Sequence, residues 1–247
     1  MINYTYSKCL DIVDAEGDIS ATQVENPNNI RQDYGRCGSD IRNMVNSNLV
    51  LKSAFPLHGA AGYLTNNWEL APIFRITSGT PINVTAGSDY SLTATGNDRP
   101  NQIPGVNPYH YTKIVKPPAG STTAQKYADE SYLSQTAFAN VCTSTSVTTC
   151  SALGTFGNTG RNSLNGPMFW QFDSQISRVF PIKEKLSLDL RIEAFNVLNH
   201  PSFANPSSSG PPNPGAATTS FGSITGTTGG VGGLAARIFQ GSLKIIF

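Results

Sequence analysis

Hydrophobic and polar residues alternate along several stretches of the chain, which is the pattern of a β-strand with two different faces. The clearest stretch covers residues 186–198, where one phase is almost entirely apolar and the other carries Asp189, Arg191 and Glu193. A helical period would place apolar and charged residues on the same stripe. The pattern therefore predicts one strand of about thirteen residues, whereas strands in globular proteins average about five or six.

Five further stretches alternate in the same way. They cover residues 2–8, 41–53, 68–77, 170–180 and 239–247, and residues 181–185 are expected to form a short turn before the strand at 186–198. Pro72 weakens the prediction for the third of these stretches, because proline cannot donate a hydrogen bond to a neighbouring strand. The coarse expectation is a sheet of six strands.

The connections between these strands alternate in length. Residues 55–67 and 181–185 are short or moderate, while 10–40, 87–167 and 199–233 are long and polar. Outer-membrane barrels have long strands, short turns at one end and long loops at the other. A soluble β-sandwich, the alternative, would have shorter strands and more even loops. The predicted fold is all-β: an antiparallel, up-and-down transmembrane β-barrel segment of about six strands with long polar extracellular loops.

Charged residues follow the polar phase of the strands, so this phase is predicted to face a polar lumen. The lumen-facing candidates are Asp173, Asp189, Arg191, Glu193 and Lys244. Arg178 and Arg237 fall on the other phase, close to strand ends where a long side chain can reach water. The aromatic residues at strand ends match interfacial girdles; these are Trp68, Trp170, Phe180 and Phe247. The alternative is a soluble sheet with one buried face.

Composition narrows the class of protein. Charged residues make up 13% of the 247 residues, and 17 basic against 16 acidic residues leave a net charge of +1. This balance argues against a nucleic-acid partner, which would favour a basic face. No run reaches the roughly 20 apolar residues of a membrane-spanning helix. Residues 1–8 alternate like a strand and lack the apolar centre of a secretory leader.

The four cysteines suggest no metal site. Cys9, Cys37, Cys142 and Cys150 form no Cys-x-x-Cys pair, and the three histidines lie far from ligand spacing, so neither a zinc site nor a cofactor is expected. Cys142 and Cys150 bracket a Ser/Thr-rich segment and could close a loop disulfide in an oxidising compartment. The alternative is four unpaired thiols without a role.

No motif demands catalysis. The glycine-rich segments 154–161 and 229–233 lack the lysine and the following helix that phosphate binding requires. Asp189 and Glu193 share a strand face with Arg191 between them, which could mimic a catalytic pair, but a charge ladder lining a polar lumen is the favoured interpretation. We therefore expect no enzymatic activity.

Six segments in order resemble the C-terminal barrel of Oar-like TonB-dependent receptors of the acidobacterial type. These segments are residues 26–29, 33–40 (Asp33-Tyr34-Gly35-Arg36 with Ser39-Asp40), 78–84, 95–101, 154–162 and 193–201. The resemblance covers essentially the whole chain.

The resemblance implies a function in uptake across the outer membrane of a Gram-negative bacterium. Such receptors have a signal peptide, a plug domain and a barrel of about 22 strands. Residues 1–247 are expected to be the C-terminal part of that barrel, without leader, plug or TonB-contacting segment. The implied partners are outer-membrane lipid, an unknown substrate, and TonB through the missing N-terminal region. A structural or adhesive surface protein is the alternative.

The C-terminal strand resembles the signature that the barrel-assembly machinery recognises. Its alternate outward positions include Phe239, Leu243, Ile245 and Phe247, and the pattern continues to the last residue. A terminal aromatic residue on this phase would anchor the strand at the periplasmic interface. The alternative is that Phe247 packs like any strand residue.

Overall fold

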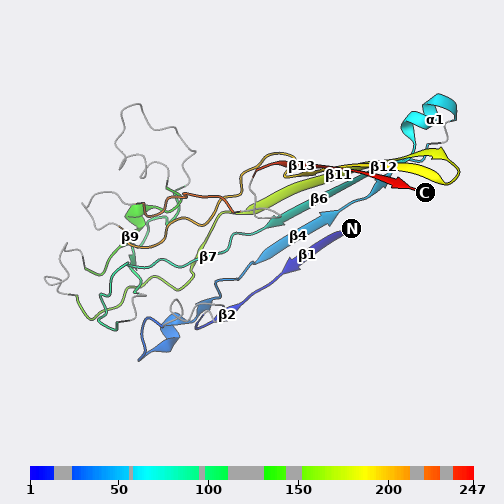
Figure 1. Cartoon of the computed structure of the whole chain (residues 1–247). Coiled ribbons are helices and arrows are strands. Elements are labelled where there is room, and N and C mark those ends of the chain that lie inside the picture. Colours follow the sequence, from blue (N-terminus) through cyan, green and yellow to red (C-terminus); the bar gives the residue numbers. More distant parts are fainter. Residues whose placement is uncertain are drawn as a thin grey trace, which may run out of the picture.

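Six strands form one antiparallel sheet in the computed structural model, which describes residues 1–13, 24–55, 58–94, 98–110, 131–142, 152–211, 220–228 and 236–247 (Figure 1). The strands are β1 (Ile2–Tyr6), β4 (Asn43–Asn48), β6 (Trp68–Thr77), β11 (Phe169–Lys183), β12 (Leu186–Phe195) and β13 (Ile238–Ile246). They lie in the sheet in chain order, each antiparallel to the next. The predicted up-and-down topology is confirmed.

Several predicted boundaries are wrong: β1 ends at Tyr6 rather than at residue 8, and the boundaries of β11 and β12 also differ. The strand expected to reach residue 198 ends at Phe195, because Asn196 takes a left-handed conformation (φ 51°) and its side chain bonds to the backbone of His200. The turn expected at residues 181–185 has only two residues outside the strands. β11 continues to Lys183, with a register shift between Pro181 and Lys183.

Pro72 lies inside β6, opposite a break in the neighbouring strand between Asn48 and Leu51. The predicted strand 41–53 is two pieces, β4 and β5 (Leu51–Lys52), which pair with β6 in one continuous register. The gap between them lies opposite Pro72. Leu49 still donates its backbone N–H to the Pro72 carbonyl at 3.1 Å, whereas proline has no N–H to return. The proline therefore interrupts the ladder without ending the strand.

The register divides the sheet into an apolar face and a polar face, because directly paired residues point to the same side. Apart from a few small or polar residues and Arg178, the apolar face consists of Ile2, Tyr4, Tyr6, Val45, Leu51, Trp68, Leu70, Pro72, Phe74, Ile76, Trp170, Phe172, Ile176, Phe180, Leu188, Leu190, Ile192, Ala194, Phe239, Leu243 and Ile245. The opposite face is mainly polar. One stripe of hydrophobic side chains thus crosses all six strands.

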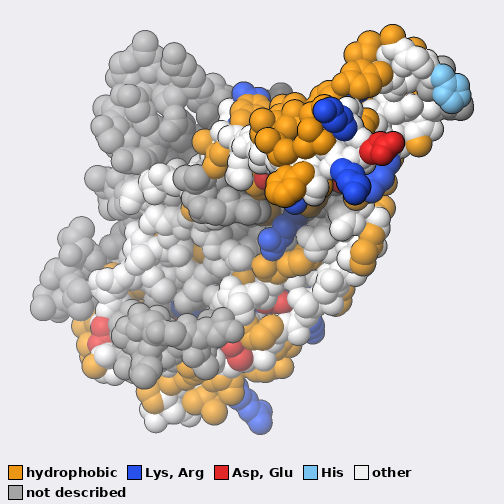
Figure 2. Space-filling model, turned by 45° about the vertical axis from the view of Figure 1, so that its right-hand side comes forward, with side chains coloured by type: hydrophobic (Ala, Val, Ile, Leu, Met, Phe, Trp, Pro, Cys, Tyr) orange, Lys and Arg blue, Asp and Glu red, His pale blue; other side chains and the backbone are white. Residues whose placement is uncertain are grey.

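The apolar face is uncovered in the described structure. Leu190, Ile192 and Leu243 are 36%, 45% and 63% exposed. Figure 2 shows hydrophobic side chains exposed over the sheet, beside charged side chains at the end that carries the helix. Soluble monomers rarely expose apolar patches larger than a few hundred Å². The arrangement therefore disfavours the alternative of a soluble sheet with a buried face.

Short and long connections lie at opposite ends of the sheet. The helix α1 (Gly59–Thr65) and the β11–β12 turn lie with the C-terminus at the right of Figure 1. Residues 7–42, 78–168 and 196–237 all leave the sheet at the other end, since each connects the far end of one strand to that of the next. This matches the predicted alternation of connection lengths.

The described parts of these three long connections pack together, and we call them the loop body. They contain the short strand pairs β2 (Leu10–Asp11) with β3 (Gly35–Arg36), β7 (Pro81–Ile82) with β10 (Leu164–Asn165), and β8 (Asn101–Gln102) with β9 (Phe138–Ala139), and the 3₁₀ turns Ile30–Asp33 and Gln135–Ala137. A buried cluster that includes Val84, Leu133, Phe138 and Phe221 lies inside. These segments were expected only as polar loops, so their common core is a finding of the structure.

Candidate functional site

Four of the five predicted lumen residues lie together on the polar face of β12 and β13. Asp189 is paired directly with Lys244, and Arg191 lies two residues further along β12. The Arg191 guanidinium is 3.8 Å from a carboxylate oxygen of Glu193. The structure thus forms the expected charge ladder, while its position in a lumen stays a prediction.

Asp173, the fifth candidate, holds the turn that follows β12. One carboxylate oxygen accepts a hydrogen bond from the backbone N–H of Asn196 at 2.7 Å. The Gln171 side-chain amide donates to both carboxylate oxygens, at 2.7 and 2.9 Å. Asp173 therefore has a positioning role that its place in the sequence alternation did not reveal.

A pocket of about 440 Å³ lies where β6 and β11 enter the loop body. It is lined by strand residues and by residues of the long connections: Ile41, Arg75, Thr77, Ser78, Gly79, Thr80, Pro167, Phe169, Phe203, Asn205 and Thr228. Sequence reasoning missed this pocket, because its walls come from three distant parts of the chain. The only sign of it in the sequence was the segment 78–84, which was noted for its resemblance to a family and supplies Ser78, Gly79 and Thr80 to the pocket lining.

A buried arginine connects the most distant parts of the loop body. The Arg99 guanidinium binds a carboxylate oxygen of Glu25 at 2.5 Å and one of Asp33 at 2.6 Å. It also donates to the Thr159 carbonyl at 2.8 Å, and Glu25, Asp33 and Arg99 are at most 3% exposed. Parts of the chain that are far apart in the sequence therefore bind the same guanidinium group, that of Arg99.

The pKa values of two acidic side chains in the loop body, Glu25 and Asp40, are displaced in opposite directions. Burial raises the pKa of Glu25 to about 7, helped by the charges of Asp33 and Asp98 and opposed by Arg99. For Asp40, burial acts in the same upward direction. Hydrogen bonds from Arg36, the Cys9 backbone and Arg42 outweigh it and lower the pKa to about 2.

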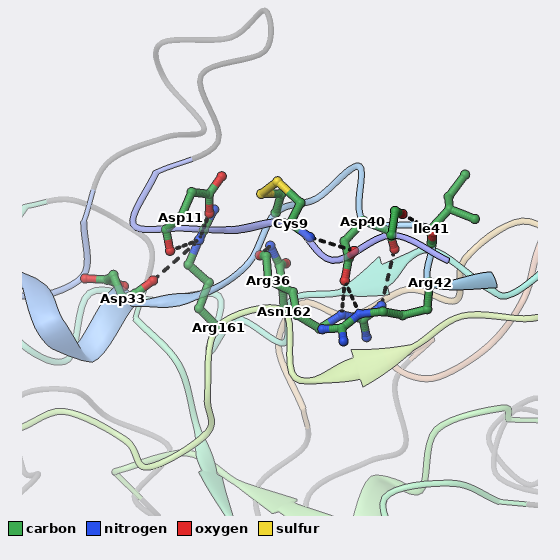
Figure 3. Close-up of a disulfide and its surroundings, with 11 residues drawn as sticks. Cys9, Asp11, Asp33, Arg36, Asp40, Ile41, Arg42, Arg161 and Asn162 are labelled. Atoms are coloured by element: carbon green, nitrogen blue, oxygen red, sulfur yellow. Dashed lines mark hydrogen bonds and ion pairs between the residues drawn. A yellow bond between two sulfur atoms is a disulfide. The ribbon is translucent and has the colours of Figure 1, made fainter. Parts of the chain in front are cut away.

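Figure 3 shows the hydrogen bonds of Asp40 beside a disulfide between Cys9 and Cys37, whose Cα atoms are 5.4 Å apart. Arg36 and Arg42 bind one Asp40 oxygen at 2.8 and 2.6 Å, and the other accepts the Cys9 backbone N–H at 3.0 Å. The alternative of four unpaired thiols is therefore wrong for Cys9 and Cys37. The bridge joins the two sides of the first long connection next to β1 and β4.

The predicted disulfide between Cys142 and Cys150 stays a prediction. Cys142 is 1% exposed and packs with Ala86 and Tyr90 in a second buried cluster. Cys150 lies outside the described residues.

A family model described as "Outer membrane beta barrel domain" matches residues 1–240. The chain belongs to this family. This outer-membrane barrel domain accordingly lies in the cell outer membrane, as predicted. No curated protein and no solved structure matches the chain. Among the described residues, none of the helices is long and apolar enough to cross a membrane.

Aromatic side chains mark both ends of the apolar face in the barrel domain. Trp68 and Phe180 lie at the short-turn end, and Phe247 follows β13 at the same end. Trp170 lies at the loop-body end, where its ring stacks on His200 with a centroid separation of 3.9 Å. Two separated aromatic bands of this kind flank the apolar belt of outer-membrane barrels.

Arg178 is enclosed by aromatic rings on the apolar face of the barrel domain. Its guanidinium lies 5.5, 5.0 and 4.4 Å from the ring centres of Tyr63, Trp68 and Phe180 and donates to the Tyr63 carbonyl of α1. The residue lies five positions before the end of β11, but opposite Trp68, the first residue of β6. Cation–π contacts, rather than a strand end alone, accommodate this charge.

The pH dependence of the loop body follows from Glu25 and Asp40. Because the folded pKa of Glu25 (about 7) exceeds its ordinary 4.5, its contribution to stability is complete below about pH 4.5 and is lost as the pH rises through 7. Asp40 contributes above about pH 3.8 and loses this contribution as the pH falls through 2. Amide-exchange protection factors in the loop body should therefore fall between pH 5 and 8. A Glu25→Gln variant should lose this dependence, and an identical profile in both proteins would contradict the assignment.

Proposed function

We propose that this domain is a sector of the barrel wall of a TonB-dependent receptor that takes up a solute across the outer membrane. The observation that carries the proposal is the six-stranded sheet itself, apolar on one face and polar on the other. Its two outer strands, β1 and β13, each have an edge that pairs with no strand among the described residues. Unpaired strand edges cost several kcal/mol per backbone group in hydrocarbon. Further strands would therefore complete the barrel, with the apolar face toward lipid and the charge ladder toward the lumen.

The order of the sequence segments that resemble Oar-like receptors supports the TonB-dependent form of this proposal. In the structure, several of these segments make direct contacts. Arg99 binds Asp33, and the backbone N–H of Asn158 donates to the Asn101 side chain at 3.1 Å. The Asn162 side chain donates to the Arg36 carbonyl at 2.7 Å. These segments that carry the resemblance are therefore parts of the same folded loop body.

The test is genetic epistasis in the native bacterium. Strains lacking the gene, lacking TonB, or lacking both are grown in defined medium, and solute depletion is followed by mass spectrometry. We expect at least one solute whose depletion slows equally in both single mutants and no further in the double mutant. Identical depletion by wild-type and gene-deletion strains, with loss of surface attachment instead, would favour an adhesive surface protein.

Phe247 is proposed as the key residue of an assembly signal formed with Phe239, Leu243 and Ile245. The side chains of these three lie on the apolar face, and Phe247 itself is 97% exposed beyond the last pair of β13. Deleting Phe247 is expected to lower the folded fraction in the outer membrane, seen as heat-modifiable mobility on gels, without changing synthesis. Phe247→Tyr, which keeps an interfacial aromatic ring, should fold like wild type. An undiminished folded band in the deletion would refute the signal.

A further inference from the structure

The pocket between β6, β11 and the loop body carries a cation that no carboxylate of the polar face neutralises. Arg75 projects from β6 on this face and lines the pocket. Three described carboxylates of the face have partners of their own: Lys52 for Glu69 at 3.2 Å, Arg191 for Glu193 at 3.8 Å, and the amide groups of Gln171 and Asn196 for Asp173. Asp189 lies directly across from Lys244 on the neighbouring strand. Within the described residues, Arg75 has no ion pair. Its guanidinium lies 5.7 Å from the ring centre of Phe169.

The part of the pocket lined by Gly79, Thr80 and Asn205 is held by close contacts that leave no space for a side chain at Gly79 or at the neighbouring Gly166. A Cβ atom on Gly79 would collide with the carbonyl oxygen of Gly166, and one on Gly166 with the side chain of Asn205. The Thr80 hydroxyl donates to the Asn205 side-chain oxygen at 3.2 Å, and the Asn205 amide donates to the Pro81 carbonyl at 3.2 Å. A wall fixed in this way loses little entropy when a ligand binds.

The pocket also offers groups for the remainder of a small solute. The Ser78 hydroxyl accepts the Asn43 backbone N–H and can still donate its own hydrogen to the solute. The Thr80 and Thr228 hydroxyls donate to Asn205 and to the Ser202 carbonyl, so they can accept hydrogen bonds from the solute. The rings of Phe169 and Phe203 can pack on its carbon atoms. The volume of about 440 Å³ falls in the range of small-molecule sites, roughly 300–1,000 Å³.

We propose that this pocket binds an oxyanion group (carboxylate, sulfate or phosphate) of the solute that the barrel takes up. The inference rests on the proposed uptake function and adds a ligand chemistry to it. The guanidinium is a planar fork that matches two oxygens of such a group. Arg75 would therefore bind the anionic group while the hydroxyls and rings contact the rest of the molecule.

The test is direct binding to the purified outer-membrane protein that contains the chain, in detergent micelles. Sodium glucuronate, sodium sulfate and inorganic phosphate are titrated calorimetrically at constant ionic strength, with glucose as the uncharged control. We expect saturable binding of at least one oxyanion and none of glucose. Arg75→Gln should weaken this binding by about tenfold or more, because it removes charge-assisted hydrogen bonds.

Two further variants make the result specific. Arg75→Lys keeps the charge but not the fork, so it should bind with intermediate affinity. Arg191→Gln removes a cation of the same face outside the pocket and should bind like wild type. Heat-modifiable mobility checks that each variant is folded. The absence of saturable oxyanion binding, or equal binding by wild type and Arg75→Gln, would overturn the inference. This assay needs no energised inner membrane, so its failure is distinct from a failure of the TonB epistasis experiment.

Discussion

Replacing Arg99 with Met should destabilise the loop body by about 3–5 kcal/mol, because it leaves the buried Asp33 carboxylate without its cation and drives Glu25, whose pKa is already raised to about 7, into its protonated form. Glu25 and Asp33 are each 1% exposed and could not regain water without opening the surrounding structure. The substitution also removes the donor to the Thr159 carbonyl, which lies 60 residues away in sequence. Amide exchange and limited proteolysis of the outer-membrane protein would measure the loss.

Arg31→Met is the matched control. Arg31 lies in the 3₁₀ turn that also contains Asp33, but it is exposed and forms no ion pair within the described residues. Its replacement should cost no more than about 0.5 kcal/mol. Combining Arg99→Met with Glu25→Gln and Asp33→Asn should recover part of the lost stability, because the uncompensated charges are then gone. Equal protease sensitivity of the Arg99 and Arg31 variants would contradict the buried-cation interpretation.

The strands could be predicted because alternation is a local property. Residues such as Leu188, Leu190 and Ile192 specify their face through their immediate neighbours, and the register then aligns them across the sheet. The end of β12 could not be predicted in this way. It depends on Asn196, whose backbone bonds to Asp173 at 2.7 Å across 23 residues, and the sequence pattern carries no information about that partner.

The loop body escaped prediction for the same physical reason. Its polar contacts join residues far apart in sequence, such as the Arg99 backbone N–H and Glu25, separated by 74 positions. Cysteine spacing alone does not determine connectivity, so the pairing of Cys9 with Cys37 could not be deduced. The pocket around Arg75 likewise appears only after three connections have folded together. Resemblance to a family marked many of these segments without giving their contacts.

Arginine on the two faces of β11 should have very different costs. Ile176 is the central residue of β11 and lies on the apolar face between Leu70 and Ile192. If this face contacts the bilayer midplane, Ile176→Arg should lower the free energy of unfolding by about 2–4 kcal/mol. Its neighbour Gln175 lies on the polar face opposite Glu193, where an added guanidinium stays in water and gains an acidic neighbour.

Gln175→Arg should therefore cost less than about 1 kcal/mol, the usual limit for a solvated charge change. The two variants differ by one position at nearly the same depth, so membrane thickness and expression affect both alike. Urea titration of the outer-membrane protein in lipid vesicles, followed by heat-modifiable mobility, gives both free energies. A large loss confined to Ile176→Arg would assign the apolar face to lipid. Equal losses would contradict the assignment of either face to lipid. A larger loss for Gln175→Arg would reverse the orientation of the sheet and with it the proposed position of Arg75 and the charge ladder in the lumen.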